Sequence, residues 1–234
     1  MKLLNAFAVL PISDWLALAW LLFAWVGYAM FAHRRAETKG SLLATTNRHR
    51  RMWMLQTTGR ENRVIDGVVV QNLSTSPSFF ASTTILIIGG LLALLGTTDR
   101  AAELVKELPF AARTSAAVFE IKLLMLTGVF VFAFFRFTWS LRQYTFVALL
   151  IASMPDFRVF ERGEAARDEY ADRAARVISL AAESFNDGLR AYYISFAVML
   201  WFSSPIAFAV GTAGIVYLLY QREFRSDVLE VLRS

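Results

Sequence analysis

The chain has 234 residues, 56% of them hydrophobic, with a formal net charge of +5 and no cysteine. Its mean hydropathy is +0.47, and an ordinary soluble domain is only roughly 45–50% apolar, so we expect an integral membrane protein and no nucleic-acid partner. Without cysteine there is no disulfide or thiolate site, and His33 and His49 are too few for a histidine metal centre within one chain. We therefore expect neither a metal nor a cofactor.

The first predicted span covers residues 15–32, with Ser13 or Asp14 as its candidate N-cap. A short apolar run containing Lys2 precedes it and ends at Pro11. Because the span follows at once, there is no room for a separate cleaved signal peptide, and we expect an uncleaved start.

A polar segment, residues 33–78, follows the first span. Five apolar residues in it recur at near-helical spacing, which predicts a short amphipathic helix on the membrane surface or beneath the bundle. They are Val64, Ile65, Val68, Val69 and Leu73. Ser76 and Pro77 then mark the entry to the second predicted span, residues 79–96.

The second span carries a face of small residues along which another helix can approach closely. These residues are Gly89, Gly90, Ala93 and Gly96. The third predicted span covers residues 118–139, and its apolar pattern persists to Ala152. We expect the same helix to run into the interface, with residues 143–154 membrane-associated; the alternative is that they re-enter or cross the membrane as a fifth span.

The last predicted span covers residues 191–220, which contain no Asp, Glu, Lys or Arg. We expect one helix bent at Pro205, because proline removes a backbone donor. Before it, residues 155–190 combine an apolar stripe with charge pairs four residues apart, which predicts a solvent-facing helix.

The distribution of positive charge determines the predicted topology. Of the 24 Lys and Arg residues, eight lie in residues 33–78 and eight in residues 136–190. The positive-inside rule places the loops 33–78 and 140–190 in the cytoplasm and both termini outside it. The predicted fold is therefore all-α: a single membrane domain, residues 1–234, built as a polytopic integral membrane four-helix bundle with cytoplasmic amphipathic helices.

Five strings of the sequence resemble the domain-of-unknown-function 599 family, in unbroken order over nearly the whole chain. They are RRMWM at residues 50–54, ENRVID at 61–66, SPSFFASTT at 76–84, FTWSLRQY at 137–144 and FNDGLRAYY at 185–193. Thr145 departs from the family pattern, in which Asn is expected. The resemblance implies a multi-pass protein of the bacterial inner (cytoplasmic) membrane, and it implies no activity.

Polar residues in or near a span are the usual pointers to function in lipid. The candidate polar pathway consists of Glu120, Lys122, Thr127, Arg136, Arg142 and Gln143. If one face of the third helix lines a path, Glu120 is its outer selectivity or proton-binding carboxylate and Arg142 its inner anion site. The competing interpretation is that these residues anchor helix ends at lipid head groups or pair with each other.

A second candidate site lies in the cytoplasmic loops. It consists of Arg50, Arg51, Trp53, Glu61, Asn62, Arg63, Asp66, Asn186 and Arg190. Its acids either gate the mouth of a path or form an acid–base pair, or they only neutralise arginines where the loop folds back on the bundle. The last two residues either join this site or cap and anchor the last helix.

No nucleophile elbow, phosphate loop, zinc-protease helix or dinucleotide fingerprint is present, which argues against an enzyme. We expect a homo-oligomeric channel or transporter, because four spans leave little interior for a pore in one copy. The alternative is a membrane scaffold or accessory subunit that binds a partner membrane complex or anionic phospholipid. A membrane enzyme acting on lipid is the third hypothesis.

Overall fold

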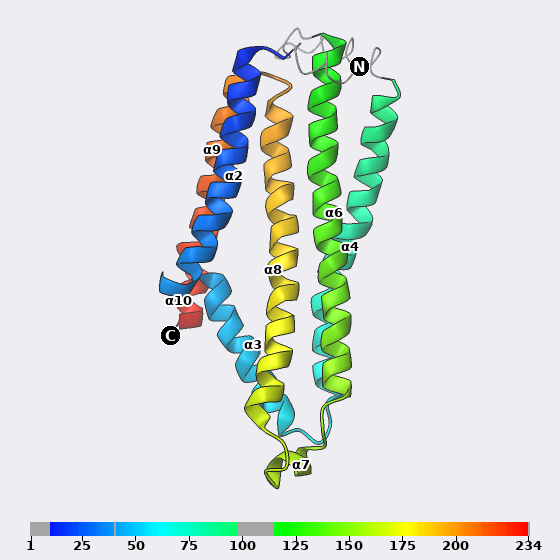
Figure 1. The fold of residues 1–234 in the computed structure, drawn as a ribbon, viewed down its shortest axis with the longest axis vertical. Coiled ribbons are helices and arrows are strands. Elements are labelled where there is room, and N and C mark those ends of the chain that lie inside the picture. Colours follow the sequence, from blue (N-terminus) through cyan, green and yellow to red (C-terminus); the bar gives the residue numbers. More distant parts are fainter. Residues whose placement is uncertain (1–9, 40, 98–114, 234) are drawn as a thin grey trace. The chain divides into compact units, whose positions relative to one another are not determined.

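The computed structural model describes residues 10–39, 41–97 and 115–233, and every element in these ranges is a helix (Figure 1). The predicted uncleaved start and most of the loop between the second and third spans lie outside the described residues. The helices are α2 (Ile12–Lys39), α3 (Leu42–Thr58), α4 (Val64–Leu95), α6 (Ala116–Ala152), α7 (Phe157–Glu161), α8 (Arg167–Leu200), α9 (Pro205–Phe224) and α10 (Asp227–Arg233).

Among the described residues, three helices are long and apolar enough to cross a membrane. These are Ile12–Ala32 within α2, Val64–Leu95 and Ala116–Ala152. They contain the first and third predicted spans and all but the last residue of the second, and their length and composition are those of a membrane protein.

The amphipathic helix expected over residues 64–73 is the first part of α4, which continues through Pro77. The proline removes one backbone donor without ending the helix. Its ring is buried, and in the preceding turn the hydroxyls of Ser74 and Thr75 donate to the Gln71 carbonyl at 2.7 and 3.2 Å. These hydroxyl bonds lie within the turn before the proline, and the helix continues through the buried ring to Leu95.

Helix α6 likewise extends past the expected end at residue 139 to Ala152. The alternative for residues 143–154 was re-entry or a separate crossing. Of these, residues 143–152 are part of this one helix, which ends at Ala152. The polar side chains of Ser140 and Gln143 are buried and bonded, as described below, so they do not interrupt it.

The largest difference from the prediction concerns residues 191–220. In place of one bent helix, α8 ends at Leu200 and α9 begins at Pro205. Three successive backbone N–H groups, beginning with that of Trp201, donate to carbonyls three residues earlier at 3.1, 3.2 and 3.0 Å. Such short-range bonds tighten and close the end of a helix.

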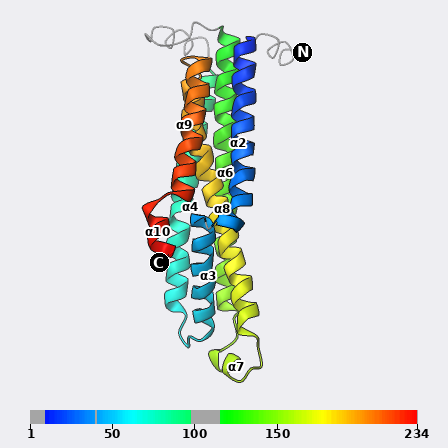
Figure 2. The same ribbon diagram turned by 90° about the vertical axis from the view of Figure 1, so that its left-hand side faces the viewer.

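Ser204 and Pro205 start the next helix. Ser204 Oγ accepts from the Ala207 N–H at 3.0 Å, so Ser204 is the N-cap of α9. Proline is favoured at the first helical position, because the N–H that it lacks would have no helical partner there. The end of α8 and α9 run in opposite directions (Figures 1 and 2), so this segment is a helical hairpin.

The chain forms two compact units. Unit 1 consists of Met1–Arg35, Thr83–Ala133 and Leu189–Arg222. Unit 2 consists of Ala36–Ser82, Phe134–Gly188 and Glu223–Ser234. In unit 1, α2 contacts α9 where Tyr28 and Ala32 are buried with Leu219.

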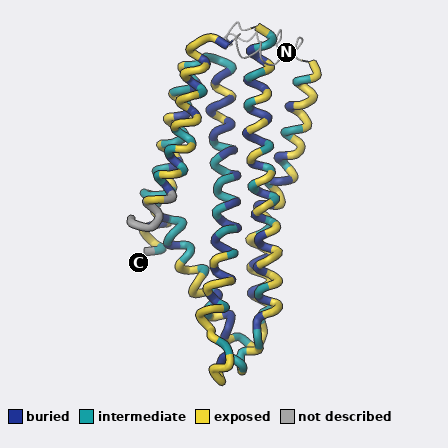
Figure 3. Tube along the Cα trace, in the orientation of Figure 1, coloured by how far each residue is buried: buried dark blue, intermediate teal, exposed yellow. Residues whose placement is uncertain are grey.

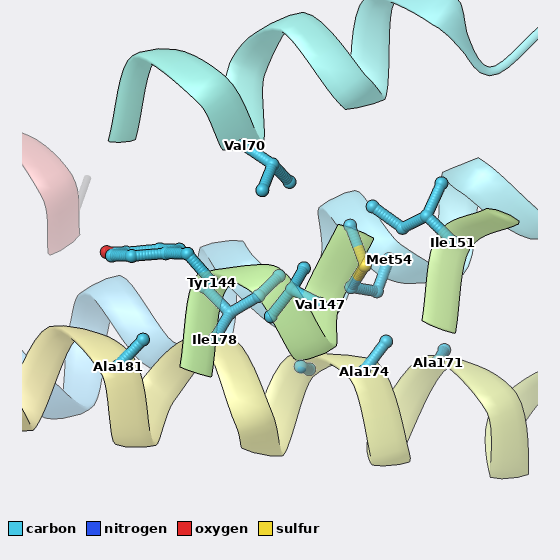
Figure 4. Close-up of a cluster of buried hydrophobic side chains, with 10 residues drawn as sticks. Met54, Val70, Tyr144, Val147, Ile151, Ala171, Ala174, Ile178 and Ala181 are labelled. Atoms are coloured by element: carbon cyan, nitrogen blue, oxygen red, sulfur yellow. The ribbon is translucent and has the colours of Figure 1, made fainter. Parts of the chain in front are cut away.

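Unit 2 has an apolar core formed by α3, α4, α6 and α8 (Figure 4). Met54, Val70, Val147 and Ile178 meet in it. Helix α8 contributes mainly alanines on this side, at positions 171, 174, 175 and 181, and such small side chains let α6 and α3 approach closely. Figure 3 shows the resulting burial along the inward faces of α6 and α8.

Candidate functional site

A buried carboxylate lies in unit 2 where α3 is connected to α4. Asp66, in the first turn of α4, is fully buried. Its Oδ1 accepts hydrogen bonds from Trp53 Nε1 at 2.6 Å, Thr57 Oγ1 at 3.0 Å and Arg60 Nη1 at 2.5 Å. Burial of a carboxylate is tolerated when a cation and neutral donors satisfy it, and the helix N-terminus favours its negative charge.

Arg63 joins the same connection to the end of α6. Its guanidinium donates to the carbonyls of Met154 at 2.8 Å, Pro155 at 2.5 Å and Thr57 at 3.2 Å. Burial lowers the pKa of Arg63, while the nearby charge of Asp156 raises it. Arginine remains protonated in proteins, so this residue acts as a fixed clamp on exposed carbonyls rather than as an acid or base.

Asp66 Oδ2 is buried and has no hydrogen-bond partner. The cluster therefore keeps one unused acceptor beside an indole and a guanidinium. No second carboxylate joins it, and no group of three or more His, Cys, Asp or Glu residues that could hold a metal ion occurs in the described part of the chain. The geometry fits a structural polar cluster better than a reaction centre.

The other residues of the predicted loop site are dispersed. Arg51 binds Asp168 and Asp172 at the start of α8, at 2.9 and 2.5 Å. Arg50 bonds within α3 to Thr46 and Asn47, and burial lowers its pKa, partly offset by Tyr144 and Glu183.

Asn62 caps α4 by accepting from the Val64 N–H at 2.9 Å, and Glu61 is exposed. Asn186 is half-buried on α8, and Arg190 belongs to unit 1. The structure thus brings together Trp53, Arg63 and Asp66 only.

Sequence reasoning did not single out two members of this cluster, Thr57 and Arg60. The available signal was weak: both lie between Trp53 and Asp66, where the end of one helix is followed closely by the start of the next.

Unit 1 contains a second buried cluster, with Lys122 of α6 at its centre. Lys122 is 1% exposed, and its Nζ donates to the Trp201 carbonyl at 2.8 Å. Asp14 of α2, 4% exposed, lies 3.8 Å from the same ammonium and accepts from Trp201 Nε1. The ammonium therefore satisfies a carbonyl at the end of α8 and neutralises an acid on α2, so the cluster holds three helices at the α8–α9 turn.

The predicted polar pathway is not continuous within either unit. Glu120 and Arg142 are exposed, and the Thr127 hydroxyl donates to the Leu123 carbonyl of its own helix at 2.8 Å. Arg136 pairs with Asp187 in unit 2, with one further buried guanidinium nitrogen, Nε, left without a partner. Lys122, Arg136 and Gln143 bond to residues outside the predicted pathway, whereas the competing interpretation expects them to pair with each other or to anchor helix ends.

The contact between α6 and α8 in unit 2 is polar and close-fitting. Ser140 Oγ donates to the Ala181 carbonyl at 2.8 Å. The Gln143 amide nitrogen donates to the Leu180 carbonyl at 3.1 Å and to Ser184 Oγ at 2.8 Å, and its oxygen accepts from Trp139 Nε1 at 3.2 Å. These bonds cross between the helices and also hold the Trp139 ring against its own helix.

The family model described as "Protein of unknown function, DUF599" matches residues 16–228, which confirms the predicted resemblance. The chain matches no curated protein and no solved structure.

Proposed function

The chain belongs to the DUF599 family of proteins of unknown function, and we propose that it is a membrane-embedded scaffold or accessory subunit. Its task is to associate, through α4, with another transmembrane helix, in the first place that of a second copy. The observation that supports this proposal is a contrast between two helices. The buried polar residues of α6 are bonded within the protein, whereas most residues of α4 are exposed.

The described polar residues of α6 that are buried already have partners within the protein. A path through a membrane protein needs polar groups that face a cavity. In the described part of α6, Lys122 and Gln143 instead face protein partners, and Thr127 bonds to its own helix. This packing favours a structural role for a single copy.

Helix α4 is little covered by the described residues of its own chain. In its most apolar stretch of 18 residues only 11% of the residues are buried, whereas 50% are buried in the corresponding stretch of α6. Gly89, Gly90 and Ala93 are exposed, and a Cβ at either glycine would meet no atom within 4 Å. Small residues favour helix–helix contact over lipid, because they let two backbones approach closely.

The test is the oligomeric state in lipid nanodiscs, measured by mass photometry and cysteine-free cross-linking. We expect dimers or larger assemblies of the wild type, and a dissociation constant raised at least about tenfold by Gly90→Leu, which corresponds to about 1.4 kcal/mol. The control is Gly128→Leu on α6, which is also exposed with open space at its Cβ. A wild type that is monomeric and purifies without a partner contradicts the proposal.

For location we propose the inner membrane of a bacterium, with residues 33–78 in the cytoplasm, as the arginine distribution favours. The hairpin alters the expected C-terminal side, because α9 returns beside α2 with Phe31 and Tyr220 in contact, their ring centroids 6.2 Å apart. Residues after Arg222 then lie on the side of Arg34, so the C-terminus is cytoplasmic and only the N-terminus is outside. A fluorescent reporter fused after Ser234 should be active and a phosphatase fusion inactive; the reverse result contradicts this topology.

A channel or transporter formed between copies is the second candidate function. The exposure of Glu120 and Arg142 favours it, because side chains that are free in one copy can line a path shared by several. Purified protein in liposomes should then pass ions, with Glu120→Gln or Arg142→Ala altering selectivity. The absence of flux over a range of pH and potential counts against it.

A further inference from the structure

Unit 1 has an open groove between α2 and α9 whose volume is about 570 Å³. This lies within the roughly 300–1,000 Å³ of typical small-molecule sites. Its walls are apolar and aromatic, and they include Trp20, Phe23, Phe31 and Tyr217. Gly27 lies in the groove, and a Cβ there would meet no atom within 4 Å, so the space beside it is open.

The groove has the length of one lipid chain. From Trp20 to Phe31, α2 rises about 16 Å at about 1.5 Å per residue, which is about half of the ~30 Å hydrocarbon thickness. The membrane-compatible part of α2 ends at Ala32, directly after Phe31. One end of the groove therefore coincides with the end of the apolar segment.

Arginines gather at this same end. Arg34 lies one helical turn beyond Phe31 and is exposed. The Arg190 guanidinium lies 5.7 Å from the centroid of the Tyr28 ring, which itself lines the groove. Arg222, two residues after Tyr220, lies 5.3 Å from the Tyr193 ring centroid and donates to its hydroxyl. Arg222 forms no ion pair with a carboxylate among the described residues.

We propose that an anionic glycerophospholipid binds here, one per protomer, with an acyl chain in the α2–α9 groove and its phosphate among Arg34, Arg190 and Arg222. Guanidinium groups bind phosphate by charge-assisted hydrogen bonds, and the aromatic rings supply apolar contact with a polar tip at the head-group level. Charge complementarity at one end selects a lipid over an apolar helix as the occupant. The inference does not depend on self-association through α4.

Native mass spectrometry of the delipidated full chain tests the site by titration with phosphatidylglycerol and with phosphatidylcholine of equal chain length. We expect one phosphatidylglycerol per protomer, bound at least about tenfold more tightly than phosphatidylcholine. Gly27→Leu should fill the groove and abolish binding of both lipids, whereas Gly128→Leu should bind as the wild type does. Arg222→Gln should weaken phosphatidylglycerol alone, by about fivefold.

A second measurement holds even if Gly27→Leu fails to fold. Phosphatidylglycerol with a brominated chain should quench the fluorescence of Trp20, so Trp20→Phe should remove more of the quenching than Trp15→Phe. Both indoles belong to α2 and are 41% exposed, but only Trp20 lines the groove. Equal binding of the two lipids, equal loss in the two Trp variants, or a Gly27→Leu variant that dissociates protomers while retaining lipid would each overturn the proposal.

Discussion

Among the described residues, Asp14 is buried in unit 1 and Asp66 in unit 2, and the two carboxylates are satisfied in different ways. Asp14 in unit 1 is neutralised by Lys122, whose side chain is only 2% exposed, so cation and anion are both removed from solvent. Asp66 in unit 2 is neutralised by Arg60, whose side chain is 37% exposed, and it also has two neutral donors. A carboxylate in a cluster without solvent contact needs a cation that is buried with it. A buried carboxylate near the surface of a unit can instead pair with a cation that remains partly solvated.

The largest expected effect comes from removing the counter-charge of the closed cluster. Lys122→Met leaves Asp14 buried without a cation, and breaking such a pair typically costs about 3–5 kcal/mol. For a chain of this size that lowers the midpoint of thermal unfolding in detergent by about 10 °C.

The neighbouring exposed position supplies the control, since Glu120→Gln should leave the midpoint unchanged. The double variant Asp14→Leu with Lys122→Met should be more stable than Lys122→Met alone, because no unpaired charge remains. A double variant with strictly additive losses would show that the two charges are not coupled.

The open cluster should tolerate the loss of its charge better. Asp66→Asn keeps an acceptor for Trp53 and Thr57 but loses the charged partner of Arg60, which costs about 2 kcal/mol. The same thermal measurement applies, with exposed Glu61→Gln as the control. If Asp66→Asn is as damaging as Lys122→Met, the distinction between a closed and an open cluster fails.

Substitution of Gly188 tests whether the stability of unit 2 depends on close contact between α6 and α8 as well as on its buried charges. A Cβ at this position would lie 2.7 Å from Cδ1 of the fully buried Phe137 ring, so Gly188→Ala should overpack the α6–α8 contact and cost about 1–2 kcal/mol. Gly128→Ala, with open space, should be neutral or slightly stabilising because alanine favours helix. Equal midpoints for the two variants would mean that the ring moves aside freely.

The smallest effect is expected where both partners are solvated. Arg51 binds Asp168 and Asp172 while all three side chains are 46–72% exposed, so Arg51→Gln should give no measurable change. Arg60→Gln, in contrast, leaves a buried carboxylate without a cation and should lower the midpoint. Both variants remove an ion pair, but only Arg60→Gln removes the partner of a buried carboxylate. A clearly lower midpoint for Arg51→Gln would contradict the expectation that burial of the partner decides the loss of stability.

The sequence located α2, α4 and α6 because long apolar runs determine membrane-compatible helices, but it misjudged where helices end. The sequence predicts a bend at Pro205, although a capping serine followed by proline is also a helix start. The local sequence is the same for a bend within one helix and for the start of a new helix. The two differ in whether the chain reverses its direction, which depends on tertiary packing. Gln143 is predicted as a pathway residue, because its partners, Leu180 and Ser184, lie on another helix and no local pattern indicates them.

The candidate sites were predictable in part, for a similar reason. Trp53, Arg63 and Asp66 are close in sequence, so their association could be anticipated, including the interpretation that the acid neutralises arginines. Asp14 was interpreted as a helix cap and Lys122 as a pathway residue, and neither pattern indicates the other, because their contact depends on packing between distant helices. Buried ion pairs of this kind require a tertiary structure.

The Asp14–Trp201 bond joins residues 187 positions apart, which has a consequence for biogenesis. Because Asp14, Lys122 and Trp201 are synthesised in that order, the acid gains its ammonium partner only after α6 is made and its indole donor only after α8 is complete. A nascent chain that stops before residue 201 lacks the indole donor and the carbonyl that the ammonium needs.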